Sequence, residues 1–369
     1  MDKQELALAR EEINRVDEEM AALFARRMRA VARVADYKIA HGLPILDEGR
    51  EKEVIARNAA RIQDEELRGF YTQYLTEGMR ISRRYQEKLV NGMKVAYSGA
   101  EGAFAAIAAK KIFPTAARIP YADFRAAYDA VVDGTCDCAV LPIENSTAGE
   151  VGQVFDMLFS GPLYISGVYD LFINQHLLAL PGTRPQDVRT VISHPQALAQ
   201  CAAYLRKRQY HTKPFENTAL AARHVLDCGD RTQAAIASDE TAALYGLEII
   251  EKNINEENIN MTRFAVLTRA MHESTAEKGR HSIIMFNVAD DAGSLGKAID
   301  VISRYGYNMR CLRSRPIKGL MWHYYFYVEI EGNLSSARGK EMLAELNGCC
   351  DKLKMLGSFA YPAELKETT

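Results

Sequence analysis

The sequence predicts a multidomain fold, in which an all-α helical domain precedes a two-lobed α/β domain and a smaller α+β domain. Three observations predict it. Residues 5–40 carry apolar side chains at close to helical spacing, with no proline or glycine to interrupt them. From Met93 the pattern changes to short apolar runs that end in polar residues and lead into helices. From His281 the expected order is strand, helix, strand, strand, helix, strand (βαββαβ). We place the domains at 1–91, 92–271 and 280–369.

The composition argues against several classes of protein. Apolar residues make up 48% and charged residues 25% of the 369, and the net charge of −2 gives no reason to expect nucleic acid or an anionic membrane as a partner. The seven cysteines show no C-x-x-C pair or zinc-type spacing, and the first residues begin a charged helix rather than an apolar targeting segment. No apolar run approaches the ~18 residues that a membrane helix needs. We therefore expect a cytoplasmic protein.

In the helical domain, the helix over 5–40 is expected to end at His41-Gly42-Leu43-Pro44, and Asp47 is suited to cap a second helix. A third helix is predicted over about 67–90, closed by Asn91-Gly92. A helix of about 35 residues is roughly 50 Å long. Because two shorter helices cannot cover such a rod, we expect the chain to self-associate.

Polar residues of these helices share faces. Arg27 and Lys38 are eleven residues apart, which places them about 20° apart around the helix, whereas Arg10 lies about 100° from that line. Arg10 therefore cannot easily serve the same site in the same subunit. Ser82 and Gln86 are four residues apart and lie on one face. Taken one at a time, these arginines also fit a solvated helix surface.

Together these residues resemble the all-helical chorismate mutase family over about 90 residues. The resemblance implies rearrangement of chorismate to prephenate, which needs a compact substrate conformer and stabilisation of charge on the breaking ether oxygen. It implies that Lys38 and Gln86 contact that oxygen as catalytic residues. Arg27 and Arg50 would hold carboxylates, Glu51 would bind the ring hydroxyl, and Arg10 would reach the partner's site. The chorismate-binding residues implied in this way are Arg10, Arg27, Lys38, Asp47, Arg50, Glu51, Ser82 and Gln86.

In the central domain, apolar runs alternate with helices. The strand expected over 139–143 stops at Glu144-Asn145-Ser146-Thr147, with Gly149 close behind, which fits either part of a binding site or a polar turn with a helix N-cap. Gly99 and Gly102 precede a helix, but no acidic residue follows at the distance that a dinucleotide site needs. The polar strand ends predict two α/β lobes that face a shared cleft. Further strands are expected over 94–97, 191–193, 234–238 and 265–267, and helices over 104–112, 128–133, 197–207 and 219–226.

Four motifs in this domain resemble the prephenate dehydratase family over roughly 93–270. They are Pro142-Ile-Glu-Asn-Ser-Thr-Ala-Gly149, Ser193-His-Pro-Gln196, Tyr245-Gly246 and Thr262-Arg-Phe264. The resemblance implies loss of water and carbon dioxide from prephenate to give phenylpyruvate, with catalytic Thr262 as donor to the departing hydroxide and Arg263 holding a carboxylate. The chain departs from the family at Ala103 and Ala105, where hydroxyl residues are common, and at Asn217, where serine is common. The prephenate-binding residues implied are Glu144, Asn145, Ser146, Ser193, His194, Gln196, Thr218, Thr262, Arg263 and Phe264.

The last domain is expected to follow a charged linker at 272–279, with strands over 281–289, 308–315, 323–331 and 352–360 and helices over 294–305 and 335–346. This order and the turn at 290–295 resemble the ACT family of amino-acid-sensing domains. The resemblance implies phenylalanine as an effector bound between paired subunits. Arg313 stands where related domains have glutamate, which reverses the charge. The effector-binding residues implied are Gly293, Ser294, Leu295, Arg313, Ser314, Arg315 and Pro316.

We therefore expect a bifunctional enzyme of phenylalanine synthesis, a chorismate mutase and prephenate dehydratase with feedback inhibition by phenylalanine. The resemblance implies no metal and no organic cofactor, and a homodimer or larger homo-oligomer. Two alternatives stay open. One is a dehydratase that prefers arogenate, because nothing in the sequence distinguishes a keto from an amino side chain. The other is a non-catalytic module that senses small acids, against which stand the intact Arg27, Lys38, Arg50, Gln86 and Thr262.

Overall fold

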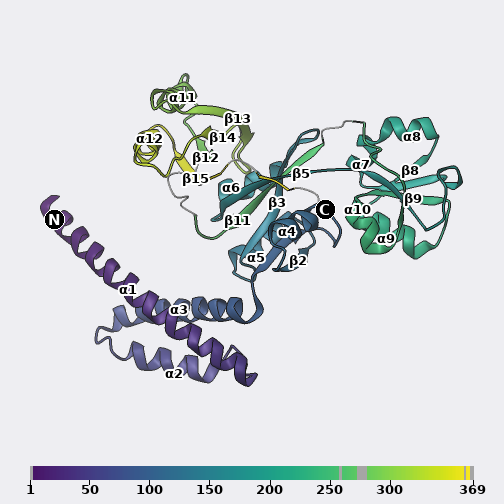
Figure 1. Ribbon diagram of the computed structural model, residues 1–369. Coiled ribbons are helices and arrows are strands. Elements are labelled where there is room, and N and C mark those ends of the chain that lie inside the picture. Colours follow the sequence, from purple (N-terminus) through teal and green to yellow (C-terminus); the bar gives the residue numbers. More distant parts are fainter. Residues whose placement is uncertain (1–2, 257–259, 272–280, 361–362, 366–369) are drawn as a thin grey trace. The chain divides into compact units, whose positions relative to one another are not determined.

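The computed structural model describes residues 3–256, 260–271, 281–360 and 363–365. The chain divides into two compact units, residues 1–93 and 94–369. Figure 1 labels their helices and strands. Within the described ranges, no helix is long and apolar enough to cross a membrane. Residues 272–279, for which the sequence predicts a charged linker, lie outside the described residues.

The first unit consists of the helices α1 (Lys3–His41), α2 (Glu48–Ala59) and α3 (Glu65–Asn91), and α3 packs against both of the others. The Asp47 side chain accepts a hydrogen bond from the Arg50 N–H at 2.9 Å and so caps α2, as predicted. Among the described residues of α1, Ala35 alone is buried. The large apolar side chains in the first two-thirds of α1 are instead exposed: Leu6, Leu8, Ile13, Val16, Met20, Leu23 and Phe24.

The second unit begins with a lobe built on a mixed sheet. Its strand order is β16-β5-β11-β3-β1-β2, and β4 pairs with β3. β1 is parallel to both β2 and β3, whereas β11 runs antiparallel to β3 and β5. The elements of this lobe are β1 (Lys94–Ser98), α4 (Phe104–Ile112), β2 (Ala117–Tyr121), α5 (Phe124–Val132), β3 (Cys138–Asn145), β4 (Gly149–Glu150), α6 (Gly152–Ser160), β5 (Tyr164–Phe172), β11 (Met261–Thr268) and β16 (Ala363–Glu364).

The second lobe lies between β5 and β11 in the chain and is built on a sheet of order β10-β6-β9-β7-β8. β7 is parallel to β8 and β9, and β6 is antiparallel to β9. The chain therefore crosses between the lobes twice, before β6 and before β11. The elements are β6 (His176–Ala179), a short 3-10 helix (Pro185–Asp187), β7 (Thr190–Ser193), α7 (Pro195–Gln200), α8 (Ala202–Arg208), β8 (His211–Pro214), α9 (Thr218–Cys228), β9 (Gln233–Ala237), α10 (Asp239–Tyr245) and β10 (Glu248–Glu251).

Residues 281–359 form an antiparallel sheet with two helices, in the βαββαβ order that the sequence predicts. The elements are β12 (His281–Asn287), α11 (Ser294–Arg304), β13 (Asn308–Pro316), β14 (Tyr324–Glu331), α12 (Ala337–Asn347) and β15 (Lys352–Phe359). The sheet order is β13-β14-β12-β15. We call residues 281–359 the C-terminal module; Figure 1 shows it in green to yellow.

Both faces of the sheet in the C-terminal module are covered. One face packs on α11 and α12 through side chains such as Ile284 and Val328. The other face joins the apolar core of the first lobe, where the rings of Phe155 and Tyr327 have centroids 4.4 Å apart. β15 passes so close to β5 that a Cβ at Gly357 would lie 2.2 Å from a backbone oxygen. The C-terminal module therefore belongs to the same compact unit as the lobes.

Several elements differ from those predicted. The helix predicted at 128–133 begins at Phe124, because Asp123 accepts a hydrogen bond from the Ala126 N–H at 2.8 Å. The helix predicted at 197–207 is two helices, α7 and α8, because Cys201 leaves the helical conformation (φ −111°, ψ 14°). The strands predicted at 139–143 and 265–267 are longer, so that β3 includes residues 144–145 and β11 includes residues 261–264. This difference decides where the polar residues of both strands point.

Candidate functional site

The two lobes meet along edges that carry polar residues. β1 and β3 end at the same edge of the first sheet, and antiparallel β11 begins there, with Thr262 paired opposite Asn145. In the second lobe, β7 and β9 end where β6 begins. A cavity of about 190 Å³ lies between these edges, and we call it the cleft. It is lined by Ala103, Phe104, Asn145, Ile173, Gln175, His194, Gln196, Ala197, Gln200, Asn217, Thr218 and Thr262.

Asn145 holds the hydroxyl of Thr262. The Asn145 Oδ1 accepts hydrogen bonds from the backbone N–H groups of Thr147 and Ala148, at 3.0 and 2.8 Å. Its Nδ2 is therefore the donor, and it donates to Thr262 Oγ1 at 3.0 Å. Because the Thr262 oxygen already accepts a hydrogen bond, its own proton can be donated to a bound molecule.

A chain of side-chain amides continues from Asn145 into the second lobe. Asn145 Nδ2 also donates to Asn260 Oδ1 at 2.8 Å, and Asn260 Nδ2 donates to Gln200 Oε1 at 3.0 Å. Gln175 Nε2 donates to the same Gln200 oxygen at 3.3 Å. Asn145, Gln175 and Asn260 are each at least 94% buried, because their exposed fractions are 6%, 2% and 3%. The chain of amides thus joins the edges of the two lobes.

Three helices begin beside the cleft. Asn217 caps α9 by accepting a hydrogen bond from the Leu220 N–H at 2.8 Å. Ala103 provides no side-chain cap for α4, which leaves the first amides of that helix available as donors. His194 Nδ1 accepts from the Gln196 N–H at 3.2 Å. Burial lowers the pKa of His194, which favours a neutral ring with its proton on Nε2.

The residues predicted to bind prephenate fall into three groups. Asn145, His194, Gln196, Thr218 and Thr262 line the cleft. Ser193 and Phe264 are buried, with exposed fractions of 0% and 1%, and the Ser193 hydroxyl donates to the backbone of Ile236 at 2.7 Å. The third group consists of Glu144, Ser146 and Arg263. These residues do not line the cleft but a separate cavity of about 430 Å³.

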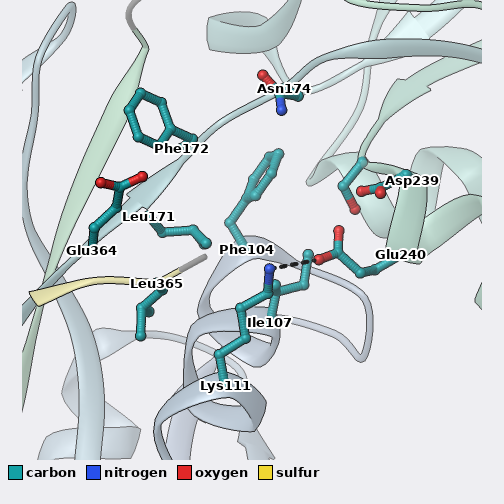
Figure 2. Close-up of a pocket in the computed structure, with 11 residues that line it drawn as sticks. Phe104, Ile107, Lys111, Leu171, Phe172, Asn174, Asp239, Glu240, Glu364 and Leu365 are labelled. Atoms are coloured by element: carbon teal, nitrogen blue, oxygen red, sulfur yellow. Dashed lines mark ion pairs between the residues drawn. The ribbon is translucent and has the colours of Figure 1, made fainter. Parts of the chain in front are cut away.

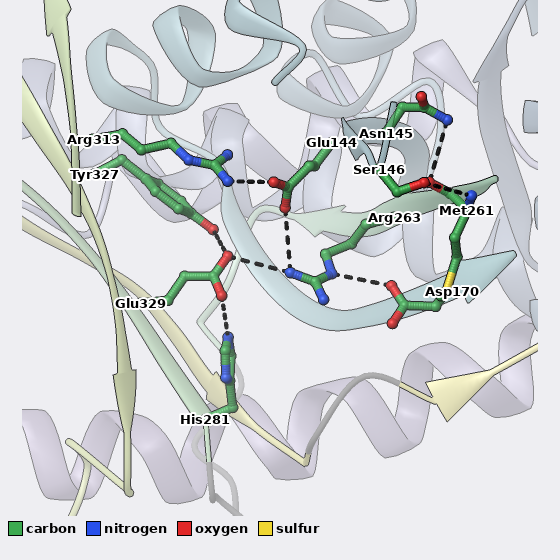
Figure 3. A network of polar contacts seen from close by, with 10 residues as sticks. All are labelled: Glu144, Asn145, Ser146, Asp170, Met261, Arg263, His281, Arg313, Tyr327 and Glu329. Carbon is green, nitrogen blue, oxygen red and sulfur yellow. Dashed lines mark hydrogen bonds and ion pairs between the residues drawn. The ribbon is translucent and has the colours of Figure 1, made fainter. Parts of the chain in front are cut away.

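Arg263 lies at the centre of this second cavity, between the first lobe and the C-terminal module. Its guanidinium contacts Asp170 at 3.0 Å, Glu144 at 3.4 Å and Glu329 of β14 at 3.6 Å. Figure 3 shows Glu144 between Arg263 and Arg313 of β13, and Glu144 accepts a hydrogen bond from each of them. Burial alone would lower the pKa of Arg263, but Asp170 and the other carboxylates raise it. Arg263 is thus held as a cation away from the cleft, because successive side chains of a strand point to opposite faces.

The residues predicted to bind an effector are also divided between two faces. Arg313 and Arg315 face the first lobe, where Arg315 pairs with Glu150 and with Asp156 at 3.2 Å. Asp156 accepts further hydrogen bonds from Tyr325 at 2.8 Å and lies 3.0 Å from Lys318. The remaining members lie at the start of α11 or at the alternate positions of β13: Gly293, Ser294, Leu295, Ser314 and Pro316.

A third cavity, of about 320 Å³, adjoins the cleft, and Phe104 lines both. Figure 2 shows the ion pair between Lys111 of α4 and Glu240 of α10, with 3.4 Å between Lys111 Nζ and Glu240 Oε1. The Thr241 hydroxyl donates to the Gly102 carbonyl at 2.8 Å, and the Tyr245 hydroxyl donates to the Glu101 carbonyl at 3.2 Å. These contacts join the two lobes, and they give the Tyr245-Gly246 motif a structural position beside the glycine loop.

In the helical unit, α1 and α3 bring part of the predicted chorismate site together. The Arg27 guanidinium donates to the Ser82 hydroxyl, and Ser82 and Gln86 are both buried. Glu51 of α2 forms an ion pair at 2.8 Å with Arg83, which follows Ser82 in α3. Three other members of the predicted site contact residues near them in the sequence. Lys38 donates to the Ile45 carbonyl, Asp47 caps α2, and Arg50 pairs with Glu53 at 2.9 Å. Arg10 is exposed.

The sequence analysis missed several residues of the cleft and of the chain of amides beside it. Gln200 lies four residues after Gln196, so helical spacing could have placed both on one face of α7. Gln175 and Asn260 lie in the two connections between the lobes and carry no local sequence signal. Their position depends on how two distant segments cross at the edges of the sheets.

Comparisons with known proteins match both units. Residues 9–87 match the family model described as chorismate mutase type II, and residues 95–272 match the one described as prephenate dehydratase. A bifunctional chorismate mutase/prephenate dehydratase from Aquifex aeolicus is 32% identical and is aligned over 98% of this chain and 99% of its own. Arogenate dehydratase/prephenate dehydratase 2 from Arabidopsis thaliana is 34% identical over 77% of each chain.

Solved structures resemble the part of the chain that carries the cleft. Prephenate dehydratase from Arthrobacter aurescens, in complex with L-Phe, matches with a TM-score of 0.67 and 28% identity, over 73% of this chain and 90% of its own. A structure described as GqqA, a novel type of quorum quenching acylase, also matches with a TM-score of 0.67, at 30% identity, over 73% of this chain and 98% of its own.

Proposed function

The chain belongs to the family of bifunctional chorismate mutase/prephenate dehydratases, and we propose that the cleft around Thr262 is its dehydratase site. The observation that carries this proposal is the hydrogen bond from Asn145 to Thr262, at 3.0 Å. It fixes the threonine oxygen as an acceptor on the protein side and leaves its proton for the substrate. The chorismate mutase activity belongs to the helical unit.

In the proposed mechanism, prephenate loses its ring carboxylate as carbon dioxide and its ring hydroxyl as hydroxide, which takes a proton from the solvent to become water. The electron pair of the breaking carbon–carboxylate bond enters the ring, and the carbon–oxygen bond breaks at the opposite ring position. Thr262 donates a hydrogen bond to the departing oxygen, where negative charge develops. A threonine proton is not acidic, so its contribution is electrostatic stabilisation by a donor held in place.

The cleft is suited to a carboxylate that is about to leave as carbon dioxide. Among its described lining residues none is lysine or arginine, and Arg263 is paired on the opposite face of β11. A cation at the ring carboxylate would stabilise the substrate more than the transition state, in which that charge has moved into the ring. The weaker donors available are the uncapped amides of α4 and the His194 Nε2 proton.

Replacement of Thr262 tests the dehydratase site. We expect Thr262→Ala to lower the prephenate turnover number at least about 100-fold, because a transition-state donor is lost, and to leave the mutase rate nearly unchanged. Thr262→Ser, which keeps the hydroxyl, is the matched control and should retain much of the activity. Steady-state assays with prephenate, arogenate and chorismate measure these rates. Parallel loss of both activities in Thr262→Ala would show that the two sites are not separate.

For the mutase reaction, we propose a site shared between two subunits of a homodimer. The reaction is pericyclic, so the protein has to position chorismate and stabilise charge on the ether oxygen. Lys38 and Gln86 would contact that oxygen, and Arg27 would hold a carboxylate. The exposed apolar side chains of α1 support a partner subunit, because a surface of this kind is stable in water only when it is covered. Arg10, which is exposed, would enter the partner's site.

We further propose that the C-terminal module is an ACT domain and that phenylalanine is its effector. The order of its elements and the L-Phe complex of the Arthrobacter aurescens enzyme support this assignment. The ion pairs of Arg313 and Arg315 support a connection to the active lobe, because they join β13 to β3, β4 and α6. An effector that moved β13 would act on Glu144, which is adjacent to Asn145.

A further inference from the structure

We propose that Gln175 is a further substrate-binding residue of the dehydratase, and that its Oε1 accepts a hydrogen bond from the ring hydroxyl of the substrate. Gln175 lies in the first connection between the lobes, immediately before β6, and lines the cleft. This inference rests on the dehydratase site proposed above. It adds a second group that acts on the same oxygen atom as Thr262.

The orientation of the Gln175 amide follows from the chain of amides. Two backbone N–H groups fix Asn145 Oδ1 as an acceptor, so the Asn145 nitrogen faces Asn260 Oδ1. The Asn260 nitrogen then faces Gln200 Oε1. Because that oxygen can only accept, the Gln175 group that approaches it at 3.3 Å has to be the nitrogen. The Gln175 oxygen is therefore the atom directed away from Gln200.

This oxygen is buried without a donor. Gln175 is 2% exposed, and among the described residues no group donates a hydrogen bond to its Oε1. A buried carbonyl oxygen with no donor carries a free-energy cost, because it has lost its hydrogen bonds to water. Such a cost at the wall of a binding cleft is removed when a ligand supplies the missing donor.

Prephenate has one donor to offer. Its two carboxyl groups are ionised at neutral pH and its keto oxygen only accepts, so the ring hydroxyl is the single group that can donate. Thr262 would donate to the hydroxyl oxygen while Gln175 accepts the hydroxyl proton. The hydrogen bond to Gln175 fixes the direction of the hydroxyl proton and so turns a lone pair of the hydroxyl oxygen toward Thr262. Gln175 therefore orients the leaving group for the donor that stabilises its departure.

Two variants and one product test the inference. In Gln175→Met, which keeps the length of the side chain but removes the acceptor, we expect kcat/KM for prephenate to fall about 10- to 100-fold. The inhibition constant of phenylpyruvate, which has no ring hydroxyl, should stay within about 2-fold. The mutase rate of the same chain and its thermal unfolding report on folding. Equal losses for prephenate and phenylpyruvate would assign Gln175 to the shape of the cleft and overturn the inference.

Gln175→Glu tests the orientation of the Gln175 side chain through a pH profile. An ionised glutamate cannot donate to Gln200, whereas a protonated glutamate can donate to Gln200 and still accept from the substrate. We expect the activity of Gln175→Glu relative to the wild type to rise as the pH falls. An activity ratio that is independent of pH would contradict the inference. Absence of prephenate turnover in the wild type, with the mutase intact, would instead contradict the proposed dehydratase site.

Discussion

At the scale of single residues, Thr262 and Arg263 are adjacent in β11 yet have different partners. Thr262 lines the cleft, and Arg263 contacts Asp170, Glu144 and Glu329 on the opposite face. The same alternation separates Asn145 from Glu144 in β3. Neighbouring residues of both strands thus line different cavities, one in the cleft and one at the contact with the C-terminal module.

Replacement of Asn145 tests how the Thr262 proton is directed. In Asn145→Asp, a carboxylate oxygen replaces the donor at 3.0 Å from the threonine oxygen, so the Thr262 hydroxyl donates to residue 145 instead of to the substrate. We expect the turnover number for prephenate to fall about 100- to 1000-fold while KM changes less, since a transition-state donor is lost. Steady-state kinetics with prephenate, with mutase activity as the internal control, measure this. A variant with unchanged turnover would show that Asn145 does not direct the proton.

The sequence was sufficient to predict residues whose local pattern places them at the cleft. Asn145 and Thr262 are at the ends of apolar runs, and His194 and Gln196 follow one directly. The family resemblance assigned Arg263 to a substrate carboxylate, and the strand was expected to start at residue 265. Because β11 begins at Met261, pairing continues through Arg263 and turns that side chain to the other face. The start of β11 depends on its long-range pairing with β3 and β5, which no local pattern reveals.

At the scale of elements, β13 is the connection between the C-terminal module and the first lobe. Arg313 and Arg315 project from one face of β13 and pair with β3, β4 and α6. The predicted effector residues Ser314 and Pro316 occupy the alternate positions of the same strand. One face of β13 therefore contacts the first lobe, and its other face carries these predicted effector residues.

Removal of the Arg313 charge tests this connection. In Arg313→Met we expect phenylalanine still to bind, because predicted contacts remain on the other face of β13. The phenylalanine concentration that half-inhibits the dehydratase should rise at least about 5-fold, because the contact with Glu144 that links the two sites is lost. The matched control is Arg304→Met, which removes an ion pair between α11 and α12 within the C-terminal module. Inhibition curves together with direct measurement of phenylalanine binding separate affinity from coupling. Identical inhibition of Arg313→Met and the wild type would exclude this route.

The ionisation of Asp156 in α6 makes the strength of the contact between α6 and β13 depend on pH. Burial alone would raise the pKa of Asp156, but hydrogen bonds from Lys318, Tyr325 and Arg315 lower it below its ordinary value. A carboxylate with a lowered pKa contributes stability above about pH 4 and loses it as the pH falls through the folded-state pKa. We expect Asp156→Asn to be about 1–3 kcal/mol less stable at pH 7 and to lose less stability below pH 4. Denaturant unfolding across pH 2–7 measures both, and parallel pH curves would refute this assignment.

Local sequence signals predicted most elements but not all of their limits. The cap at Asp47 and the uninterrupted apolar spacing of α1 placed helices correctly to within a few residues. The break between α7 and α8 at Cys201 has no proline or glycine to announce it. Strands such as β5 and β6, which carry the chain between lobes, were not predicted, because their position depends on pairing with β11 and β9.

At the scale of the whole molecule, the sequence predicted three domains, whereas the chain packs as two units. The predicted boundary near residues 271–280 lies within the second unit. Both faces of the sheet in the C-terminal module carry buried apolar side chains, and Tyr325 and Tyr327 complete the core of the first lobe. A pattern of apolar residues shows that a face is buried, but it does not show which neighbour covers it.

The exposed stripe of α1 leads to a prediction about subunits. If Arg10 completes the mutase site of the partner, then Arg10→Ala and Lys38→Ala are each inactive as homodimers, yet a mixed dimer has one intact site. Random pairing of co-expressed variants should restore about a quarter of the wild-type mutase rate per dimer. Chorismate turnover of the co-purified mixture measures this, and the dehydratase rate serves as the control. A mixture as inactive as its parents would place Arg10 and Lys38 in the same subunit's site.

The return of the chain from β15 to the first lobe has a consequence for how such proteins exchange parts. Ala363 and Glu364 pair with Tyr169 and Asp170 of β5, and the Leu365 N–H donates to the Asp170 carbonyl at 2.8 Å. The C-terminal module is thus inserted between two strands of one sheet, β11 and β16. A single genetic crossover after residue 271 removes an edge strand of the first lobe together with the C-terminal module. A clean exchange of this module between related genes needs two crossovers, one on each side of the insertion.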